Sequence, residues 1–406
     1  MNPYGPSFFK NNRQNLKAQI DSNLPIVLTA HTQMQCSADM AFPFRQDTNF
    51  WYLTGSNEPD LLYVHDLQNE YIVLPKSNAM RDVFDGSIDS KKLAEISGIS
   101  NILSYKEGWA LIAKIAQRSK RIATQLPVNA LQTHYGISPN PSRKQLIAKL
   151  RRIQKELSVE DIRLSFARLR MIKSKEELTA LQDAVDLTVG AFELAKSSIT
   201  SSKYSYEIEA EMTRHFRKSN AQHAYPPILA GGKSACTLHY VNNSDVLRPG
   251  EQILIDVGAE TSKGAADITR TYAIGAPSKR LKDVHAMVLQ LHTYAMSQLK
   301  PGVYMQEYER NVEKEMGKGL KDLGLITNLE RSEIRTYFPH ATSHFLGLDV
   351  HDMADYSEPL AANMVLTVEP GIYIPEEGIG VRIEDDVRIT NDGAKNMSEA
   401  LSTDLC

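Results

Sequence analysis

The hydrophobic pattern divides the chain into a first part of alternating strand-like and helix-like segments and a second part rich in amphipathic helices. The apolar run LPIVLT (24–29) predicts a short strand, and LLYV and EYIVLP on either side of polar HDLQN (65–69) predict a hairpin. Helical spacing follows in KKLAEISG and in GWALIAKIAQRSKRIATQL. A mixture of strands and helices of this size indicates one α/β domain.

The stretch 142–170 is rich in Arg and Lys, with acidic residues interspersed. It is interpreted either as a patch for an anionic partner or as one solvated helix followed by a connector. Mixed charge is typical of a helix face turned to water, which favours the second interpretation. We therefore place a domain boundary near residue 165, which predicts domains 1–165 and 166–406.

The second domain opens with a clear helix start. Ser174 with Glu177 three residues later forms a capping box, and apolar residues then follow at helical spacing from Leu178 to Phe192. The same spacing predicts helices over 205–219, 280–299 and 304–323.

Composition narrows the classes of function. A net charge of −3 over 406 residues provides no basic excess, so nucleic acid is not expected as the principal partner. The chain shows neither an apolar run fit for a membrane span nor an N-terminal signal peptide, so no membrane partner is expected. Three cysteines far apart in sequence suggest neither a disulfide framework nor a zinc site, and the cytoplasm is the expected compartment.

Several familiar catalytic and nucleotide-binding motifs are absent from the sequence or incomplete in it. LAGGKSAC (229–236) superficially suggests a phosphate loop, but Pro227 stands where a Walker A motif needs its first glycine. The sequence contains no HExxH motif, no GxSxG elbow and no GxGxxG after a strand. Nucleotide-binding, zincin and serine-hydrolase interpretations therefore lose their usual support.

Two segments of the second domain, 253–274 and 365–389, share one acidic pattern. Each has an apolar run, an acid, a glycine two residues later, a turn-like piece and a second acid. The acids are Asp256 and Asp267 in the first segment, and Glu369 and Glu384 in the second.

Residue spacing predicts how these acids meet across two hairpins. The first pair is directly opposite if the turn is centred between positions 261 and 262, and the second pair if it is centred between positions 376 and 377, within PEEG. Each pair would then have Cβ atoms about 4.5–5.5 Å apart on one face of its hairpin.

Opposed carboxylates beside apolar runs need a compensating cation, because like charges facing each other destabilise a sheet. Arg270 and Arg382 lie nearby in sequence, but two divalent metal ions would cancel the charge of all four acids. The alternative is two ordinary amphipathic hairpins whose acids face solvent.

Histidines gather between the two acidic segments. FPHATSHFLGLDVHD (338–352) holds His340, His344 and His351, and a histidine can ligate a metal or move a proton near neutral pH. His239 lies just before the first acidic segment and can face the same pocket. Asp349 and Asp352 can orient imidazoles. The remaining histidines are interpreted as structural or exposed: His31, His65, His134, His215, His223, His285 and His292.

At this point the second domain resembles the pita-bread metallopeptidases, whose ligand order is Asp, Asp, His, Glu, Glu. That order falls on LIDVG, GAADITRTY, SHFLGLDVHD, TVEPGIY and VRIEDD, which implies the metal ligands Asp256, Asp267, His344, Glu369 and Glu384. FPFRQDTNFWYLTGSNEPD (42–60) is similar to the N-terminal domain of bacterial Xaa-Pro aminopeptidases (aminopeptidase P). The resemblance implies an α/β N-terminal domain followed by an α+β pita-bread (creatinase/aminopeptidase) catalytic domain.

The same resemblance implies hydrolysis of the N-terminal Xaa-Pro bond by a dinuclear metal site. The oxygen-rich ligand set favours Mn²⁺ over Zn²⁺. Asp267 and Glu384 would bridge the ions, and Glu369 would also take the proton of the attacking water. A homo-oligomer, dimer or tetramer, is expected, with peptides that have proline at the second position as the substrates.

Further roles follow from the resemblance alone. His340 and His351 would contact the substrate and stabilise the tetrahedral intermediate. His239 would line the proline side of the pocket, and Arg382 would orient a ligand carboxylate and the bound substrate.

One departure from the family leaves the preferred substrate length open. Aminopeptidase P enzymes often carry a Trp-Gly-Arg-Arg-type stretch that reaches a neighbouring subunit, whereas this chain has RDVFDGSID, with Phe84 at the Trp position. A prolidase acting on dipeptides therefore stays an alternative. A non-catalytic pita-bread binding module and a metal-free creatinase-like hydrolase are disfavoured, because all five ligand positions are filled.

Overall fold

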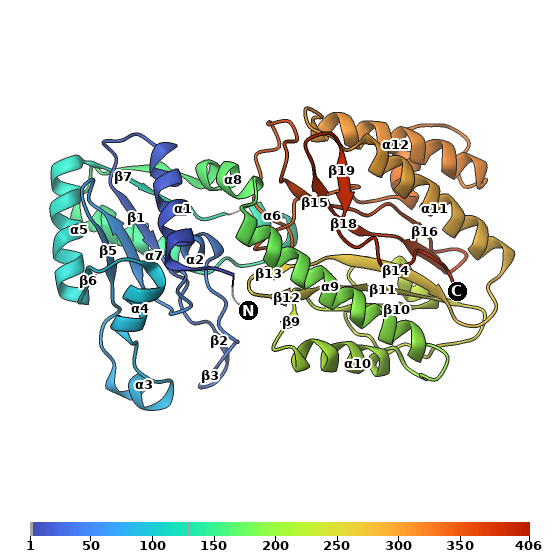
Figure 1. The fold of residues 1–406 in the computed structure, drawn as a ribbon, viewed down its shortest axis with the longest axis horizontal. Helices are drawn as coiled ribbons and strands as arrows, with labels where there is room; N and C mark the ends of the chain where they lie inside the picture. The colour runs from blue at the N-terminus through green and yellow to red at the C-terminus, as the bar shows by residue number, and fades with distance from the viewer. Residues whose placement is uncertain (1–2, 129) are drawn as a thin grey trace. The chain divides into compact units, whose positions relative to one another are not determined.

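The computed structural model describes residues 3–128 and 130–406, apart from the side chains at positions 130, 131 and 134 (Figure 1). His134, expected to be structural or exposed, thus lies outside the described side chains. The chain forms two compact units, Tyr4–Leu169 and Arg170–Cys406.

The N-terminal unit is built on a mixed sheet with the order β6-β5-β4-β1-β7-β8. β4 runs antiparallel to β1 and β5, and β7 and β8 run parallel to β1. The hairpin around HDLQN is confirmed, with Leu62 facing Val73. The bounds are β1 Ile26–Thr29, β4 Leu62–His65, β5 Glu70–Val73, β6 Ile102–Leu103, β7 Arg121–Thr124 and β8 Ser158–Asp161, with a small hairpin of β2 Gln35–Ser37 and β3 Met40–Ala41.

Helices cover this sheet. Gly108 lets one of them, α5, approach β5 closely, because a Cβ there would stand 2.2 Å from the side chain of Val73. The bounds are α1 Pro6–Ala18, α2 Thr48–Thr54, α3 Ala79–Phe84, α4 Ser90–Ser97, α5 Tyr105–Ser119, α6 Ala130–Tyr135, α7 Ser142–Ile153 and α8 Arg163–Met171.

Two expectations for this unit are wrong. The long helical segment ends at Ser119, where Lys120 adopts a left-handed conformation with φ 54°, and RIAT after it forms β7. The stretch 142–170 is not one helix and a connector but α7, β8 and α8. β8 is a short edge strand whose residues stay partly exposed, so it leaves no hydrophobic alternation for the sequence to show.

The C-terminal unit begins with α9, whose capping box between Ser174 and Glu177 is confirmed. The three further predicted helices are also confirmed, as α10, α11 and α12. The bounds are α9 Lys175–Ser198, α10 Ser205–Lys218, α11 Lys279–Gln298, α12 Met305–Asp322 and α13 Arg331–Tyr337, with a short 3₁₀ helix η1 at Gly232–Cys236.

Small sheets form the centre of this unit, in the orders β10-β11-β14, β13-β12-β9, β15-β18-β19 and β16-β17. α9 contacts β12 and β13, α10 contacts β9 and β10, and α11 contacts β15, β16 and β17 (Figure 1). The bounds are β9 Gln222–His223, β10 Ile228–Gly231, β11 Gln252–Val257, β12 Ala259–Thr261, β13 Gly264–Ala265, β14 Ile268–Ala273, β15 Val365–Val368, β16 Gly371–Ile374, β17 Ile379–Arg382, β18 Asp385–Ile389 and β19 Ala394–Asn396.

The predicted register of the first acidic hairpin is wrong. Asp256 pairs with Thr269 rather than Asp267, because the turn is centred on Ser262 and Lys263, one position later than predicted. Both turn residues have positive φ, the conformation of tight hairpin turns. Asp267 still shares a face with Asp256, because it lies two residues before Thr269.

The predicted register of the second acidic hairpin is confirmed. Gly371 pairs with Arg382 in one ladder and Val368 with Asp385 in the next, both about the predicted turn centre. Glu369 and Glu384 lie in the break between the ladders. An isolated bridge joins Glu384 to Thr269 and so brings the two acidic segments together.

Candidate metal centre

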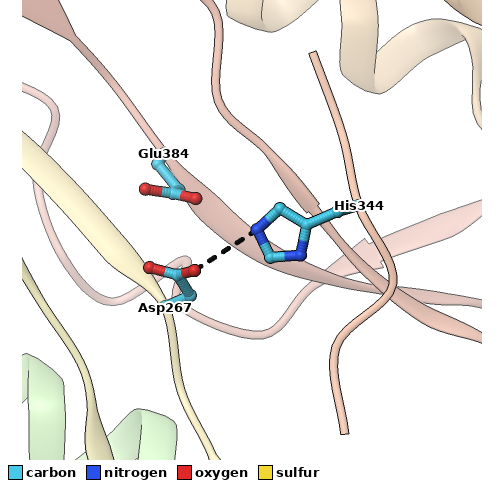
Figure 2. A group of neighbouring side chains, drawn as sticks. All are labelled: Asp267, His344 and Glu384. Carbon is cyan, nitrogen blue, oxygen red and sulfur yellow. Dashed lines mark ion pairs between the residues drawn. The ribbon is translucent and has the colours of Figure 1, made fainter. Parts of the chain in front are cut away.

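Three of the five predicted ligands meet in one buried cluster. One ligand atom from each of Asp267, His344 and Glu384 lies within 4.8 Å of the others (Figure 2). Nε2 of His344 is 3.4 Å from a carboxylate oxygen of Asp267. Asp267 directly precedes β14, Glu384 directly precedes β18, and His344 comes from the segment between α13 and β15.

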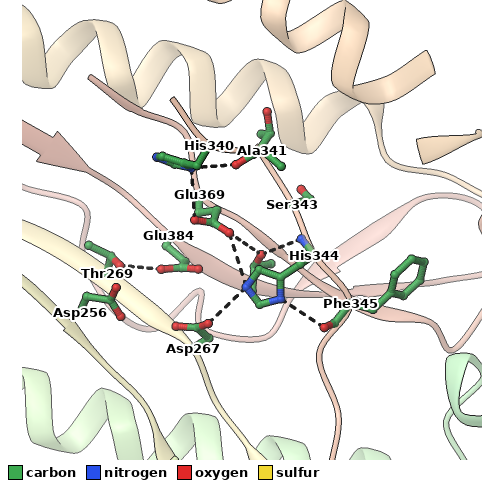
Figure 3. A network of polar contacts seen from close by, with 12 residues as sticks. Asp256, Asp267, Thr269, His340, Ala341, Ser343, His344, Phe345, Glu369 and Glu384 are labelled. Carbon is green, nitrogen blue, oxygen red and sulfur yellow. Dashed lines mark hydrogen bonds and ion pairs between the residues drawn. The ribbon is translucent and has the colours of Figure 1, made fainter. Parts of the chain in front are cut away.

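The other two predicted ligands adjoin this cluster. Nε2 of His344 is also 3.5 Å from Glu369 (Figure 3). The hydroxyl of Tyr225 is 2.5 Å from Asp256 and 2.6 Å from Asp267. A hydroxyl carries one hydrogen and can donate it to only one of these carboxylates. The other carboxylate therefore needs a proton or a cation.

Burial makes this group of acids unfavourable as free carboxylates. It raises the pKa of Glu369 to about 8 and the pKa of Glu384 well above its ordinary range, and neighbouring carboxylates add to both shifts. Burial also raises the pKa of Asp256, although the charge of Arg382 opposes the shift. Hard oxygen donors with one imidazole suit divalent cations, so the residues present fit the metal ions that the sequence implies.

The imidazole of His344 lies among these carboxylates, which shift its pKa. Burial would lower its pKa, but the hydrogen bond to Asp267 and the charges of Glu369 and Asp267 outweigh burial and raise the pKa to about 9. A histidine ligates metal in its neutral form, so metal binding here displaces a proton.

His340 lies at the other side of Glu369, with Nδ1 3.5 Å from the carboxylate (Figure 3). Burial, and then the charge of Arg382, lowers its pKa to about 3, so the ring is neutral. Nδ1 is 2.8 Å from the carbonyl of Ala341, which only accepts, so Nδ1 carries the hydrogen. Nε2 then accepts from the hydroxyl of Tyr373 at 2.8 Å.

His351 and His239 are both exposed. The ring of His351 meets the ring of His344 edge to face, with centroids 4.3 Å apart. Desolvation, and then the charge of His344, lowers the pKa of His351, and the charge of His239 contributes in the same direction. The structure therefore brings both histidines to the exposed side of the cluster.

Arg382 is buried among the ligands. Its guanidinium pairs with Asp256 and donates to the hydroxyls of Thr269, at 3.1 Å, and Tyr373, at 2.8 Å. Its side chain thus faces Asp256 and the base of the cluster, where it offsets part of the negative charge.

Sequence reasoning missed the residues that hold these ligands in place. Tyr225 bridges two acids, Thr269 donates to Glu384 at 2.5 Å, and Asp386 accepts from the backbone N–H of Asp267 at 3.0 Å. Tyr373 links Arg382 to His340. Thr269 and Tyr373 could have been predicted from the sequence, because they follow Asp267 and Glu369 at even spacing, which puts them on the same face of a strand. Nothing in the pattern around Tyr225 marks it.

Glu309 is a further missed residue, and it acts on the histidine segment. Its carboxylate accepts from the backbone N–H groups of Thr342, at 2.9 Å, and Ser343, at 3.0 Å. These contacts fix the chain directly before His344.

Comparison with known proteins identifies the family. Residues 179–391 match metallopeptidase family M24, and residues 9–123 match the aminopeptidase P N-terminal domain. The chain belongs to metallopeptidase family M24, and the expected fold of an α/β N-terminal domain with a pita-bread catalytic domain is confirmed.

Individual relatives extend over nearly the whole chain. A Xaa-Pro aminopeptidase of Haemophilus influenzae is 30% identical over 98% of this chain and 95% of its own length. Human Xaa-Pro aminopeptidase 3 is 31% identical over 93% of this chain and 78% of its own length. The structure of Escherichia coli aminopeptidase P with the inhibitor Pro-Leu superposes with a TM-score of 0.84 at 27% identity, covering 98% of this chain and 96% of that chain.

A putative aminopeptidase P from Bacillus anthracis superposes with a TM-score of 0.89 at 28% identity, over 99% of this chain and 96% of that chain. Within the part of the chain that the structure describes, no helix combines the length and apolarity needed to cross a membrane.

The buried acids predict that metal stabilises the protein more strongly as pH rises. The folded pKa of Glu369 lies above that of an unfolded glutamate, so the metal-free folded state keeps protons that the unfolded chain loses. His344, with its raised pKa, contributes stability that is likewise lost as pH rises. Metal-free stability should therefore fall between about pH 5 and about pH 9.

Calorimetric melting of the chelated protein, with and without added Mn²⁺, measures this. At a free metal concentration about 100 times the dissociation constant, binding adds about 2.7 kcal/mol. The difference in Tm should be larger at about pH 8 than at about pH 6, because protons compete with the metal. A difference that shrinks with rising pH would contradict the assignment.

Proposed function

We propose that this metallopeptidase removes the first residue from peptides with proline at the second position. The observation that carries the proposal is the convergence of the five proposed ligand side chains, with His340 and His351 beside them, in the pita-bread domain. The full-length similarity to Xaa-Pro aminopeptidases supports the same substrate class.

The proposed metal ligands are Asp256, Asp267, His344, Glu369 and Glu384, and Mn²⁺ is the proposed ion. Four carboxylates and one imidazole form a hard donor set, which suits Mn²⁺. Structural zinc, by contrast, is typically bound by thiolates. Two bound ions would supply Lewis acidity and an activated water.

Side chains of the protein would accept the proton of the attacking water and donate a hydrogen bond to the substrate. Glu369 lies 3.5 Å from Nε2 of His344, beside the other proposed ligands, and its carboxylate would take the proton of the attacking water. His351, which is exposed and contacts the ring of His344, would donate a hydrogen bond to the substrate carbonyl oxygen.

His340, Arg382 and His239 would position the peptide. The chain of hydrogen bonds from Arg382 through Tyr373 to His340 fixes the ring of His340 beside Glu369. His239 would line the side that receives the proline ring.

Proline at the second position requires a dedicated site. The Xaa-Pro bond lacks an N–H group, so peptidases that hold substrates as extended strands lose a hydrogen bond there. A pocket shaped for the pyrrolidine ring replaces that contact, and we expect it to accept the trans peptide bond.

The substrate prediction separates this function from prolidase activity. Xaa-Pro-Yaa tripeptides should release their first residue faster than Xaa-Pro dipeptides, and Xaa-Ala-Yaa should be slower by about ten- to a hundredfold, because the ring contacts are absent. Time courses of amino-acid release with Mn²⁺ measure this. Faster cleavage of the dipeptide would assign the enzyme as a prolidase, and equal rates for Pro and Ala would refute the proline specificity.

A second prediction separates ligand from catalytic roles. Asp267→Ala should abolish activity and lower the bound metal, whereas His351→Ala should keep the metal and lower kcat by about a hundred- to a thousandfold. Atomic absorption and steady-state kinetics measure both effects. The matched control is Asp283→Ala on the exposed surface of α11, which should change neither quantity. Loss of metal from His351→Ala would reverse the assignment.

The protein is further proposed to form a homo-oligomer, dimer or tetramer. α3 presents Met80, Val83 and Phe84 on one face at exposed fractions of 67%, 80% and 78%, an apolar surface typical of an interface. Phe84 stands where aminopeptidase P enzymes carry a Trp.

Sedimentation velocity tests this proposal. Val83→Asp should shift the protein to a smaller species, because it places a charge in the apolar face. Ile137→Asp, at another exposed position of the same unit, should not. Identical sedimentation of Val83→Asp and the parent protein would contradict the interface.

The cytoplasm is the proposed compartment. Cys36, Cys236 and Cys406 are all free thiols, which a reducing compartment maintains. Recovery of the protein with periplasmic or secreted fractions would contradict this.

A further inference from the structure

A buried network of charged side chains holds the end of the histidine segment 338–352. Arg170, in the last turn of α8, pairs with one carboxylate oxygen of Asp352, and the ammonium of Lys173 is 3.1 Å from the other. Arg170 also pairs with Asp349 at 2.8 Å. The side chains of Arg170, Lys173 and Asp352 are 0%, 1% and 1% exposed, and all belong to the C-terminal unit. Two cations therefore hold the carboxylate of Asp352 in the interior of that unit.

The backbone of Asp352 connects this network to two histidines. Its N–H donates to the carbonyl of Phe345 at 2.8 Å, and these two residues directly follow His351 and His344. The same carbonyl lies 3.2 Å from Nδ1 of His344 and only accepts, so Nδ1 carries a hydrogen (Figure 3). One carbonyl thus orients the ring of His344 and fixes the point at which the chain returns after His351.

The loop between the two histidines is packed on both sides. A Cβ at Gly347 would stand 2.1 Å from a carboxylate oxygen of Asp352, so only glycine leaves room for that carboxylate. The carbonyl of Gly347 accepts from the N–H of Ala265 at 3.1 Å, two residues before Asp267. The loop is therefore fixed to the buried network on one side and to the first acidic hairpin on the other.

Stability alone does not account for this network. Taking charges out of water costs free energy, and apolar side chains of similar size are often as stable as a buried ion pair. What the network provides is fixed geometry, since the donors of Arg170 and Lys173 meet the carboxylate in set directions. The expectation that Asp352 orients an imidazole by direct contact gives way to an indirect route through the backbone.

We propose that Asp352 is a positioning residue for His351. Its carboxylate is held by the two buried cations, and its backbone fixes the imidazole of His351 beside that of His344. The inference rests on the proposed function, in which His351 donates to the substrate carbonyl oxygen. Asp352 acts through His351 and takes no direct part in the reaction.

Nuclear magnetic resonance of the full-length, metal-free protein tests the geometry without catalysis. The chain has 11 histidines, so the protein is labelled with ¹³C at histidine Cε1, and His351→Ala identifies the signal of His351 by its loss. The ring of His344 shifts that signal, because the two ring centroids are 4.3 Å apart. Asp352→Asn keeps the shape of the side chain but removes its charge. It should move the His351 signal toward the value of a histidine in an unstructured peptide.

A double-mutant cycle tests the effect on the reaction. Asp352→Asn should keep the bound metal and lower kcat for Xaa-Pro-Yaa tripeptides by about ten- to a hundredfold, because a displaced donor meets the substrate poorly. In the His351→Ala protein the same substitution should change kcat by less than about twofold, because no imidazole is left to position. A merely structural Asp352 would lower kcat by the same factor in both proteins.

Lys173→Met is a milder second variant. It removes one cation and leaves Asp352 paired with Arg170. The His351 signal should therefore move in the same direction by a smaller amount, and this variant decides the geometry if Asp352→Asn does not fold.

The matched control is Glu70→Gln in the N-terminal unit. Glu70 likewise binds an arginine and a lysine, Arg13 and Lys17, each at 2.9 Å. Its substitution should lower Tm but leave kcat and the His351 signal unchanged.

The proposal is overturned if either Asp352→Asn or Lys173→Met, when folded, leaves the His351 signal unmoved. It is also overturned if Asp352→Asn changes kcat by the same factor with and without His351. If the parent protein cleaves no Xaa-Pro-Yaa peptide, the proposed function fails, while the His351 signal still decides the role of Asp352.

Discussion

Confinement of four carboxylates and one imidazole within a buried space is the constraint on which the rest of this structure depends. Burial, together with the neighbouring carboxylates, raises the pKa values of Glu369 and Glu384, so the metal-free fold holds protons that metal binding would displace. Buried ions are tolerated only where opposite charge or hydrogen bonds compensate them. Metal bound at the proposed site would therefore stabilise the catalytic unit as well as take part in its chemistry.

The architecture of the catalytic unit serves this confinement. The two acidic segments lie far apart in sequence, and the bridge between Thr269 and Glu384 joins them at the point where the ladders break. Arg382 and Tyr225 then fix the orientation of Asp256 by direct contacts. Because these partners leave few free conformations, the ligands need little rearrangement when metal binds, which lowers the entropic cost of assembling the site.

The N-terminal unit contributes through different chemistry. The ammonium group of Lys149 lies over the ring of Trp109 there, beside the first turns of two helices. None of these features is a metal ligand, and none belongs to the acidic cluster. An exposed apolar face on α3 adds a surface suited to association. The two units thus differ in chemistry: the buried acids lie in the C-terminal unit, and the exposed apolar face of α3 lies in the N-terminal unit.

The sequence by itself determined the helices of the second domain and the second hairpin, because each depends on local spacing: a capping box at Ser174, helical periodicity, and a PEEG turn centred as predicted. The proposed ligand set came from the resemblance of its motifs to a known family. The sequence pattern misplaced the first hairpin by one position, since two residues with positive φ moved the turn. Only the tertiary structure brought Tyr225 between two acids and paired Arg382 with Asp256. Such contacts join residues 31 to 126 positions apart, and long-range distances of this kind follow from how strands and helices pack, not from any local pattern.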